Sequence, residues 1–346
     1  MSKKLSVAIP THNRAAYLSE CVGSILNQTF QDFDIFVFDD ASEEPVAEEL
    51  KKLNDRRIHF IGSEKNVGAE ENVNRILRYP FNSEYLTIFD DDDAMHPKLL
   101  ELQVSLLDGN KDVIFVASGF NRVYDNAIYN FRSLDENKIK YVIYKNSGRE
   151  FIKAVMSWLT FPVSSTMYRL KVLGGSKMEP EKFSDFLDMV FLMKISKKGH
   201  GVFIDAPLVN YRVHAGQYSK LPKKGYEQGA INTASFFKES FPASFTELPF
   251  MEARGRKRTK FSYEYKKEQK MLRRYSLNFL LRAYADINRG FFDFLRFIRR
   301  CRRENLVKYS DFKYIDIRGF VSIISIVFKN KEIISTTRWL KDLFQS

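Results

Sequence analysis

The sequence has little cysteine and no long apolar run, and each shortage excludes a class of protein. Its 346 residues include two cysteines, Cys21 and Cys301. They lie too far apart to indicate a metal-binding spacing or a disulfide framework, so we expect a reducing compartment. No run approaches the roughly 18 apolar residues of a membrane span, and residues 319–328 reach only about half that length. A chain that crosses the membrane is therefore not expected.

Glycine-rich phosphate loops are missing as well. No Gly-x-Gly-x-x-Gly follows the first apolar segment, and no Walker-type Gly-Lys-Ser/Thr occurs anywhere. Any bound phosphates must then be held by a metal ion. The apolar run after Met-Ser-Lys-Lys is too short for a signal-peptide core, so no leader is expected.

Positive charge is concentrated in the last quarter of the chain. Residues 254–346 hold 24 Lys and Arg against 9 Asp and Glu, whereas residues 1–253 carry a net charge of −3. Such an asymmetry predicts two functional zones, with the basic one facing anionic lipid, a phosphorylated acceptor or nucleic acid.

Short apolar segments alternate with helical patterns along the first half. Strands are predicted at 5–9, 35–38, 58–61, 85–89 and 113–117, and helices at 18–26, 44–53, 68–77 and after Pro97. Further predictions are a hairpin within 121–144, a strand at 164–168 and a helix from Phe186. This alternation is typical of a parallel sheet with right-handed crossovers.

Four consecutive carboxylates, Asp90 to Asp93, end the apolar segment that begins at Tyr85. Such a cluster repels itself at low dielectric, so a hard divalent cation such as Mn or Mg is the expected partner. The alternative is a solvated acidic turn before a helix. Because ligands bind beyond the carboxyl ends of parallel strands, residues 11–14, Asp39 and Asp40 are expected on the same rim.

Five motifs in order, Ser6–Arg14, Ser24–Phe30, Val37–Ser42, Asn66–Gly68 and the Asp run before Pro97, resemble those of an inverting family 2 glycosyltransferase of bacterial cell-surface polysaccharide type. The resemblance covers about residues 4–215. It implies an α/β fold, namely a GT-A Rossmann-like, mostly parallel sheet flanked by helices, here with a basic C-terminal helical region.

The resemblance also implies roles for particular residues. Nucleotide-binding positions would be Pro10, Thr11, His12, Asn13, Arg14, Asp39, Asp40, Asn66, Gly68, Asp90 and Asp91. The base would lie against Thr11 and His12, and Asp39 and Asp40 would reach the uracil or ribose. Asp92 would contact the metal, and His214 the metal or the diphosphate, although His214 is as readily a structural residue. The family commonly has Tyr at His12 and Arg near Glu71, so nucleotide binding is better supported than uridine preference.

Asp188 stands where the family places its catalytic base, and Asp185 is the alternative. A carboxylate favoured in the first turn of a helix is the structural explanation of Asp188. The expected base would take a proton from the acceptor hydroxyl as it attacks the sugar.

Three regions are expected: a catalytic domain at 1–220, a lid or linker at 221–258 and a mainly helical basic region at 259–346. In the last, Arg282, Arg289, Arg296 and Arg303 recur every seven residues and so stay near one helix face. That face could dock on an anionic membrane or simply be solvated.

The prediction is a metal-dependent inverting enzyme that moves a sugar from a nucleotide-sugar, a UDP-sugar in the first instance, to a glycan or lipid-linked acceptor. It would be cytoplasmic, peripheral on the inner face of the plasma membrane, with Mn or Mg as cofactor and no nucleic acid partner. Alternatives are a nucleotidyltransferase, which would more naturally have a Gly-rich, Lys-containing phosphate loop, and a basic nucleic-acid-binding protein.

Overall fold

A computed structural model of the chain describes residues 2–124, 128–131, 133–144, 163–214, 216–217, 225–240, 280–281, 284 and 291–304. These residues divide between two compact units. The first holds the described residues up to Pro180 and from Leu187 to Gln217. The second holds Glu181–Phe186 and the described residues from 225 onward. The predicted boundaries at 220 and 258 stay a prediction.

The amino-terminal half of the first unit is a parallel βα repeat. Its elements are β1 (Leu5–Thr11), α1 (Ala15–Leu26), β2 (Phe33–Asp39), α2 (Val46–Lys52), β3 (Ile58–Gly62), α3 (Ala69–Arg78) and β4 (Tyr85–Ile88). The strands lie in the order β3-β2-β1-β4, and all three pairings are parallel. Short apolar strands joined by amphipathic helices produce this order, as the alternation of patterns predicted.

The second half of the sheet mixes strand directions. It contains β5 (Ala94–Met95), α4 (Leu99–Gly109), β6 (Val113–Tyr124), η2 (Glu136–Lys138), β7 (Tyr141–Tyr144), η3 (Val163–Ser165), β8 (Thr166–Arg169), η4 (Leu170–Val172), α7 (Leu187–Ser196) and β9 (His200–Val213). Strand β8 is antiparallel to both β4 and β6, and β9 is parallel to β6. The whole sheet is therefore mixed, with a parallel block at its amino-terminal side.

The predicted hairpin within 121–144 is wrong. Strand β7 pairs antiparallel with β9, and not with β6. The reason is a long-range one, because β9 pairs with β6 along its whole length, from Val113 to Tyr124, and leaves its own other edge for β7. No local sequence pattern shows with which strand β7 pairs.

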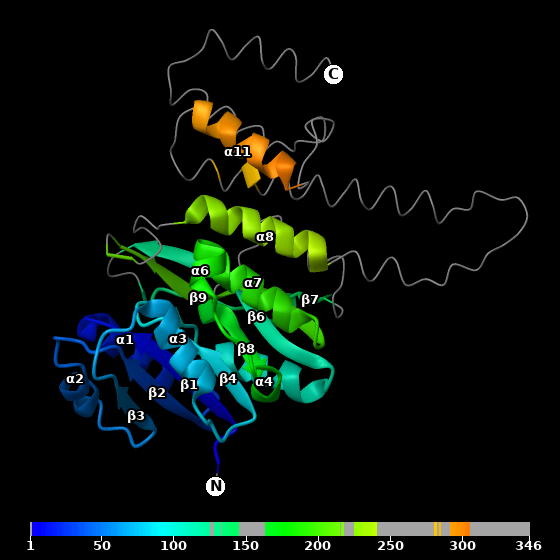
Figure 1. The fold of residues 1–346 in the computed structure, drawn as a ribbon. Helices are drawn as coiled ribbons and strands as arrows, with labels where there is room; N and C mark the ends of the chain where they lie inside the picture. Colours follow the sequence, from blue (N-terminus) through cyan, green and yellow to red (C-terminus); the bar gives the residue numbers. More distant parts are fainter. Residues whose placement is uncertain are drawn as a thin grey trace, which may run out of the picture. The chain divides into compact units, whose positions relative to one another are not determined.

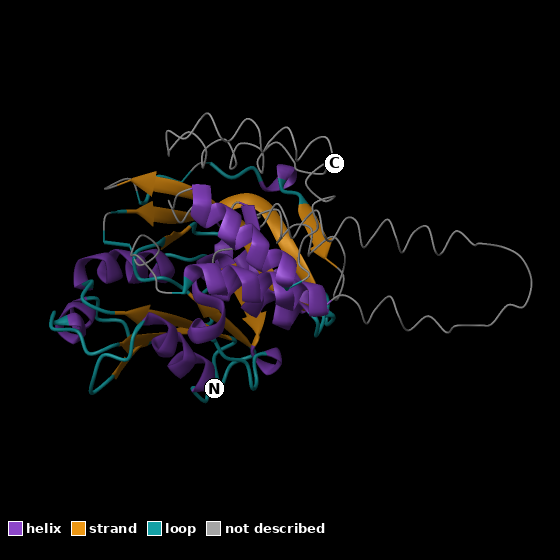
Figure 2. Ribbon diagram, turned by 45° about the horizontal axis from the view of Figure 1, so that its top comes forward, coloured by secondary structure: helices purple, strands orange, loops and turns teal. Residues whose placement is uncertain are grey.

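Apolar side chains on alternate strand positions divide the core between two faces of the sheet. Leu5, Val7 and Ile9 of β1 face α1, α2 and α4, which supply buried residues such as Val22, Leu50 and Val104. The opposite face carries α3 and α7, which lie in front of the strands in Figure 1, and Phe191 of α7 packs edge-on against Tyr168 of β8. Helices thus cover both faces (Figure 2), and the strand ends are left to form a site.

The second unit is built from α6 (Pro180–Phe183, shared at its first residue with the first unit), η5 (Ser184–Phe186), α8 (Tyr226–Ser240) and α11 (Phe291–Arg303). Phe183 meets Phe236 of α8, and Tyr284 packs on Phe294 and Phe297 of α11. Gly229 is required because a Cβ there would lie 2.7 Å from the Phe183 carbonyl oxygen. Two small groups of packed aromatic rings therefore lie within this unit.

Helix α11 has the two-sided character predicted for the basic region. Phe294, Phe297, Ile298 and Cys301 are buried, whereas Arg296, Arg299, Arg300, Arg302 and Arg303 are exposed. The predicted positions Arg282 and Arg289 lie outside the described residues. In the part of the chain that the structure describes, no helix combines the length and apolarity needed to cross a bilayer.

Candidate active site

The carboxyl ends of β1, β2 and β4 bring together residues that are distant in the sequence. The Thr11 hydroxyl donates to Asp91 at 2.6 Å, and the Asp40 amide donates to the Thr11 carbonyl at 2.9 Å. Asp39, Asp40, Asp91 and Thr11 are all buried. Parallel strands end at a common edge, so three separate polar loops become one surface.

Arg14 bridges two members of the Asp run. One guanidinium nitrogen lies 3.0 Å from Asp91 and 3.0 Å from Asp92, and the other donates to the Gly216 carbonyl at 2.9 Å. The His214 Nε2 atom lies 2.9 Å from the same Asp92 oxygen. Arg14 therefore neutralises part of the carboxylate charge, and it links the loop after β1 to the residues that follow β9.

Burial and mutual repulsion disturb the titration of this cluster. Burial, together with the Asp92 charge, raises the pKa of Asp90 to about 7. The pKa of Asp91 rises to about 6 through burial, although Arg14 opposes the shift. Burial and the charges of Asp90 and Asp92 raise the pKa of Asp93 strongly, and its Oδ2 atom is buried without a partner among the described residues. The carboxylates of this run therefore repel one another in a buried setting, and a bound cation would reduce that repulsion.

Asp39 and Asp40 hold loops in place. Asp39 accepts the Ser42 hydroxyl at 2.5 Å, and Asp40 accepts the Val67 and Gly68 amides at 2.9 Å each. Gly68 has a φ of +91°, a region that L side chains avoid, so glycine is needed at the start of α3. The two carboxylates thereby fix the loops of the rim to which the sequence analysis assigned nucleotide binding.

The remaining predicted nucleotide-binding residues lie on the same rim. His12 Nε2 accepts the Asn66 amide at 2.9 Å and lies 3.2 Å from the Asn13 amide. Asn13, with a φ of 53°, also accepts the Glu43 amide at 2.8 Å. Pro10 pairs in register with Phe38 of β2.

Sequence reasoning assigned no role to α1, yet this helix supports the loop that carries the Asp run. Cys21 contacts the Asp90 carbonyl at 3.5 Å, and the Ser24 hydroxyl accepts the Met95 amide at 3.0 Å. Gln28 donates to the His96 carbonyl at 2.8 Å and accepts the Leu100 amide at 3.0 Å. The motif Ser24–Phe30 was the sequence signal that this region matters, but only the fold shows which residues it contacts.

Asp188 is the second residue of α7, in the first unit, and is exposed. Its negative charge contributes to the raised pKa values of Asp90 and of buried Tyr168, so the carboxylate is within electrostatic reach of both. Ser164 joins this group by donating to Asp90 at 2.6 Å. The side chain of Asp185, the alternative base, lies outside the described part of the structure.

The donor chemistry at Asp92 and His214 fits a divalent cation. A carboxylate oxygen and an imidazole nitrogen are both ligands that such ions take, and these two atoms lie 2.9 Å apart. Within the described residues, no three His, Cys, Asp or Glu side chains are grouped to hold a metal. The protein would thus provide two ligands, as at sites where a substrate phosphate supplies others.

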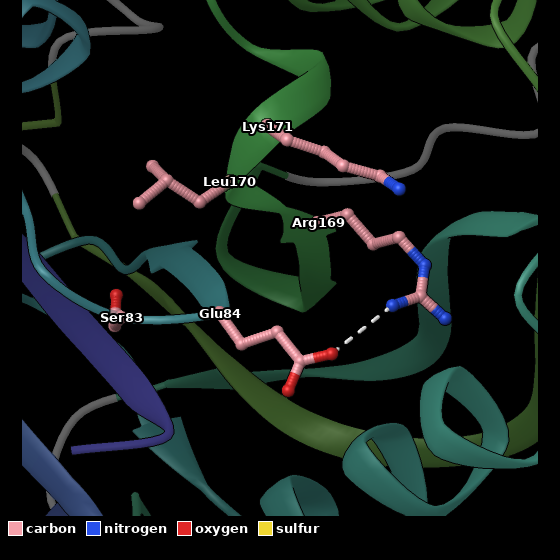
Figure 3. A pocket seen from close by; sticks show the side chains of 5 residues that line it. All are labelled: Ser83, Glu84, Arg169, Leu170 and Lys171. Atoms are coloured by element: carbon pink, nitrogen blue, oxygen red, sulfur yellow. Dashed lines mark hydrogen bonds and ion pairs between the residues drawn. The ribbon is translucent and has the colours of Figure 1, made fainter. Parts of the chain in front are cut away.

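A pocket of about 290 Å³ lies at the other end of β4, away from the Asp run (Figure 3). Ser83, Glu84, Arg169, Leu170 and Lys171 line it. The Arg169 guanidinium is committed to the fold, since it donates to the Val113 carbonyl at 2.7 Å and to the Asn110 carbonyl at 3.1 Å. This pocket is therefore not the candidate active site.

Comparisons with known proteins agree with this arrangement. A family model described as "Glycosyl transferase family 2" matches residues 6–169. An uncharacterized glycosyltransferase of Methanocaldococcus jannaschii is 36% identical over 219 residues, which are 62% of this chain and 72% of that relative. The Escherichia coli protein named UDP-Glc:alpha-D-GlcNAc-diphosphoundecaprenol beta-1,3-glucosyltransferase WfgD is 26% identical over 42% of this chain and 56% of its own length.

Three glycosyltransferases of Rickettsia match at 25–26% identity over 67% of this chain, which spans only 32–37% of their length. Among solved structures, S. aureus TarS 1–349 in complex with UDP-GlcNAc aligns with a TM-score of 0.57 and 14% identity, over 97% of this chain and 92% of that one. At this identity the likeness concerns the fold alone.

Proposed function

Starting from the membership of this chain in glycosyltransferase family 2, we propose that it moves a sugar, with inversion, from a UDP-sugar to a hydroxyl of a lipid-linked or cell-surface glycan. The observation that carries this proposal is the convergence of Thr11, Arg14, Asp91, Asp92 and His214 at the carboxyl ends of β1, β4 and β9. The E. coli relative is named for UDP-Glc and for a diphosphoundecaprenol-linked acceptor. That name supports both substrate classes.

Different residues of the rim would bind different parts of a nucleotide-sugar. The surface formed by His12, Asn66 and the loops fixed by Asp39 and Asp40 would receive the base and ribose. Asp90 and Asp91 would border the ribose and diphosphate, and Arg14 contributes a positive charge beside them. A divalent cation held by Asp92 and His214 would supply the charge that stabilises the departing diphosphate.

Asp188 would act as the general base. As the acceptor hydroxyl attacks the anomeric carbon, its proton passes to the Asp188 carboxylate, and the bond from that carbon to the diphosphate breaks on the opposite side. One displacement inverts the anomeric configuration. The exposure of Asp188, which would leave it open to an acceptor, and the effect of its charge on Asp90 support this assignment.

A screen of nucleotide-sugars tests the proposal. With Mn present, a UDP-sugar should be hydrolysed slowly, and UDP with Mn should raise the melting temperature, because a ligand bound only to the native state stabilises it. Short duplex DNA or RNA should not. Stabilisation by nucleic acid with no effect of any nucleotide would contradict the proposal.

The acceptor class gives the exposed arginines of α11 a role. Their charge complements the anionic headgroups of a membrane in which a lipid-linked acceptor is embedded. Ion pairs engage some of this charge, since Arg300 contacts Glu227 at 3.6 Å and Arg296 contacts Asp293. Peripheral docking is therefore proposed with the function, and it is tested below.

A further inference from the structure

A buried arginine, Arg212, contacts the segment that carries the candidate metal ligand Asp92. Arg212 of β9 is 3% exposed, and its charge is balanced by an ion pair with Glu20 of α1. Neither residue has a role in the transfer step proposed above. Burying a charged side chain costs free energy unless several partners bind it. The partners of Arg212 therefore indicate which segments it positions.

Arg212 ties β9 to the Asp run at two points. Its Nε–H donates to the Asp92 carbonyl at 2.9 Å, and its own backbone amide donates to the Asp93 carboxylate at 3.0 Å. His214, two residues later and just beyond the end of β9, meets the Asp92 side chain at 2.9 Å. The bonds of Arg212 therefore set the offset between the two segments that carry the candidate ligands.

The ring of Tyr17 completes the support. The Arg212 guanidinium lies over this ring, 4.5 Å from its centroid, and the His214 imidazole lies 5.0 Å from the same centroid. Glu20 stands one helical turn after Tyr17 on α1, so the two act from a common face. The Tyr17 ring thus contacts both the Arg212 guanidinium and the candidate metal ligand His214.

We infer that Arg212, Glu20 and Tyr17 form a positioning unit that holds His214 and Asp92 close enough together for both to bind one divalent cation. The inference rests on the proposed function, since it concerns the cation assigned to that site. Residues that orient metal ligands through hydrogen bonds typically change metal affinity about 10- to 100-fold when they are replaced.

The decisive variant is Arg212→Lys, which keeps the charge but has one donor group in place of a fork. It can reach either Glu20 or the Asp92 carbonyl. We expect the Kd for Mn measured with saturating UDP to rise about 10- to 100-fold. The Kd for UDP measured in EDTA should change less than about twofold. Isothermal titration and the electron paramagnetic resonance signal of free Mn give both values without an activity assay.

Two further variants separate positioning from a general structural effect. Tyr17→Phe keeps the ring and should bind Mn like the wild type, whereas Tyr17→Ala should weaken Mn binding. Arg169→Lys is the matched control, because Arg169 is also buried and bonded to backbone carbonyls, but at the other end of β4. It should lower the melting temperature and leave the Kd for Mn unchanged.

The outcomes are distinguishable. If Arg212→Lys weakens UDP binding in EDTA as much as Mn binding, or if Arg169→Lys weakens Mn binding equally, the inference is overturned. A wild-type protein that binds UDP but no Mn overturns it as well, while leaving nucleotide binding intact. A wild-type protein that binds neither contradicts the proposed function itself.

Discussion

At the scale of single residues, the assignment of Asp188 as the general base is the part of the proposed mechanism that one substitution tests most directly. Replacement by Asn removes the proton acceptor and keeps the size of the side chain, so transfer should fall about 10²- to 10⁴-fold. UDP affinity and the melting temperature should stay near the wild-type values. Rates of sugar transfer with saturating donor provide the measurement.

Asp185→Asn is the matched control, because Asp185 is the other carboxylate that the sequence offers at this helix. It should retain transfer. Full activity in Asp188→Asn combined with loss in Asp185→Asn would exchange the two assignments. Full activity in both would remove general-base catalysis from α7.

Asp90 makes the stability of the metal-free protein depend on pH. Its pKa rises from 3.8 to about 7 on folding, mainly through burial. The folded state therefore retains a proton that the unfolded chain loses, and this contribution to stability disappears as pH rises from about 4 to 7. Asp90→Asn removes that dependence, so in EDTA the variant should gain stability relative to the wild type between pH 4 and pH 7.5.

Melting temperatures across that range measure the effect. Asp112→Asn, an exposed position on the same unit, serves as the control and should follow the wild type. A constant difference between Asp90→Asn and the wild type at every pH would show that Asp90 does not titrate in this window.

At the scale of elements, α1 and the residues that follow it support the Asp loop, and Gln28, two residues after the end of α1, makes two hydrogen bonds to that loop. Replacement by Leu leaves the Leu100 amide without its partner and removes one of two donors to the His96 carbonyl, which keeps the Leu99 amide at 2.9 Å. An unsatisfied buried amide costs about 1–3 kcal/mol, so Gln28→Leu should lower the free energy of unfolding by about 2 kcal/mol. Urea denaturation measures the change.

Gln31→Leu is the control for this helix end, because Gln31 is exposed and Gln28 is 2% exposed. We expect its unfolding free energy to stay within about 0.5 kcal/mol of the wild type. Equal losses in the two variants would mean that α1 is not a specific support of the Asp loop.

At the scale of the whole molecule, the basic face of α11 predicts binding to anionic vesicles. Arg299→Glu with Arg303→Glu reverses two exposed charges, and at about 1 kcal/mol for each arginine we expect at least about a tenfold loss of binding. Flotation with vesicles rich in phosphatidylserine measures it. Binding by the wild type should weaken as salt is raised.

Lys52→Glu with Lys138→Glu reverses the same number of charges at exposed positions of the first unit, where the side chains are 67% and 83% accessible. This control should float like the wild type. An equal loss in both pairs would mean that net charge, and not α11, governs the interaction.

The fold class and the strand-end location of the site could be read from local patterns. Period-two apolar segments, helical repeats and polar residues at strand ends are short-range properties, so they predicted the repeat from β1 to β4 and the rim that carries Thr11, Asp40 and Asp91. The residue roles proposed for that rim remain predictions.

Only the tertiary structure decided which segments meet. It paired β7 with β9, joined His214 to Asp92, and placed Tyr17 and Glu20 of α1 behind them. Those contacts join residues separated by up to 192 positions. They depend on the competition of all strands and helices for partners, which no local stretch of this sequence records.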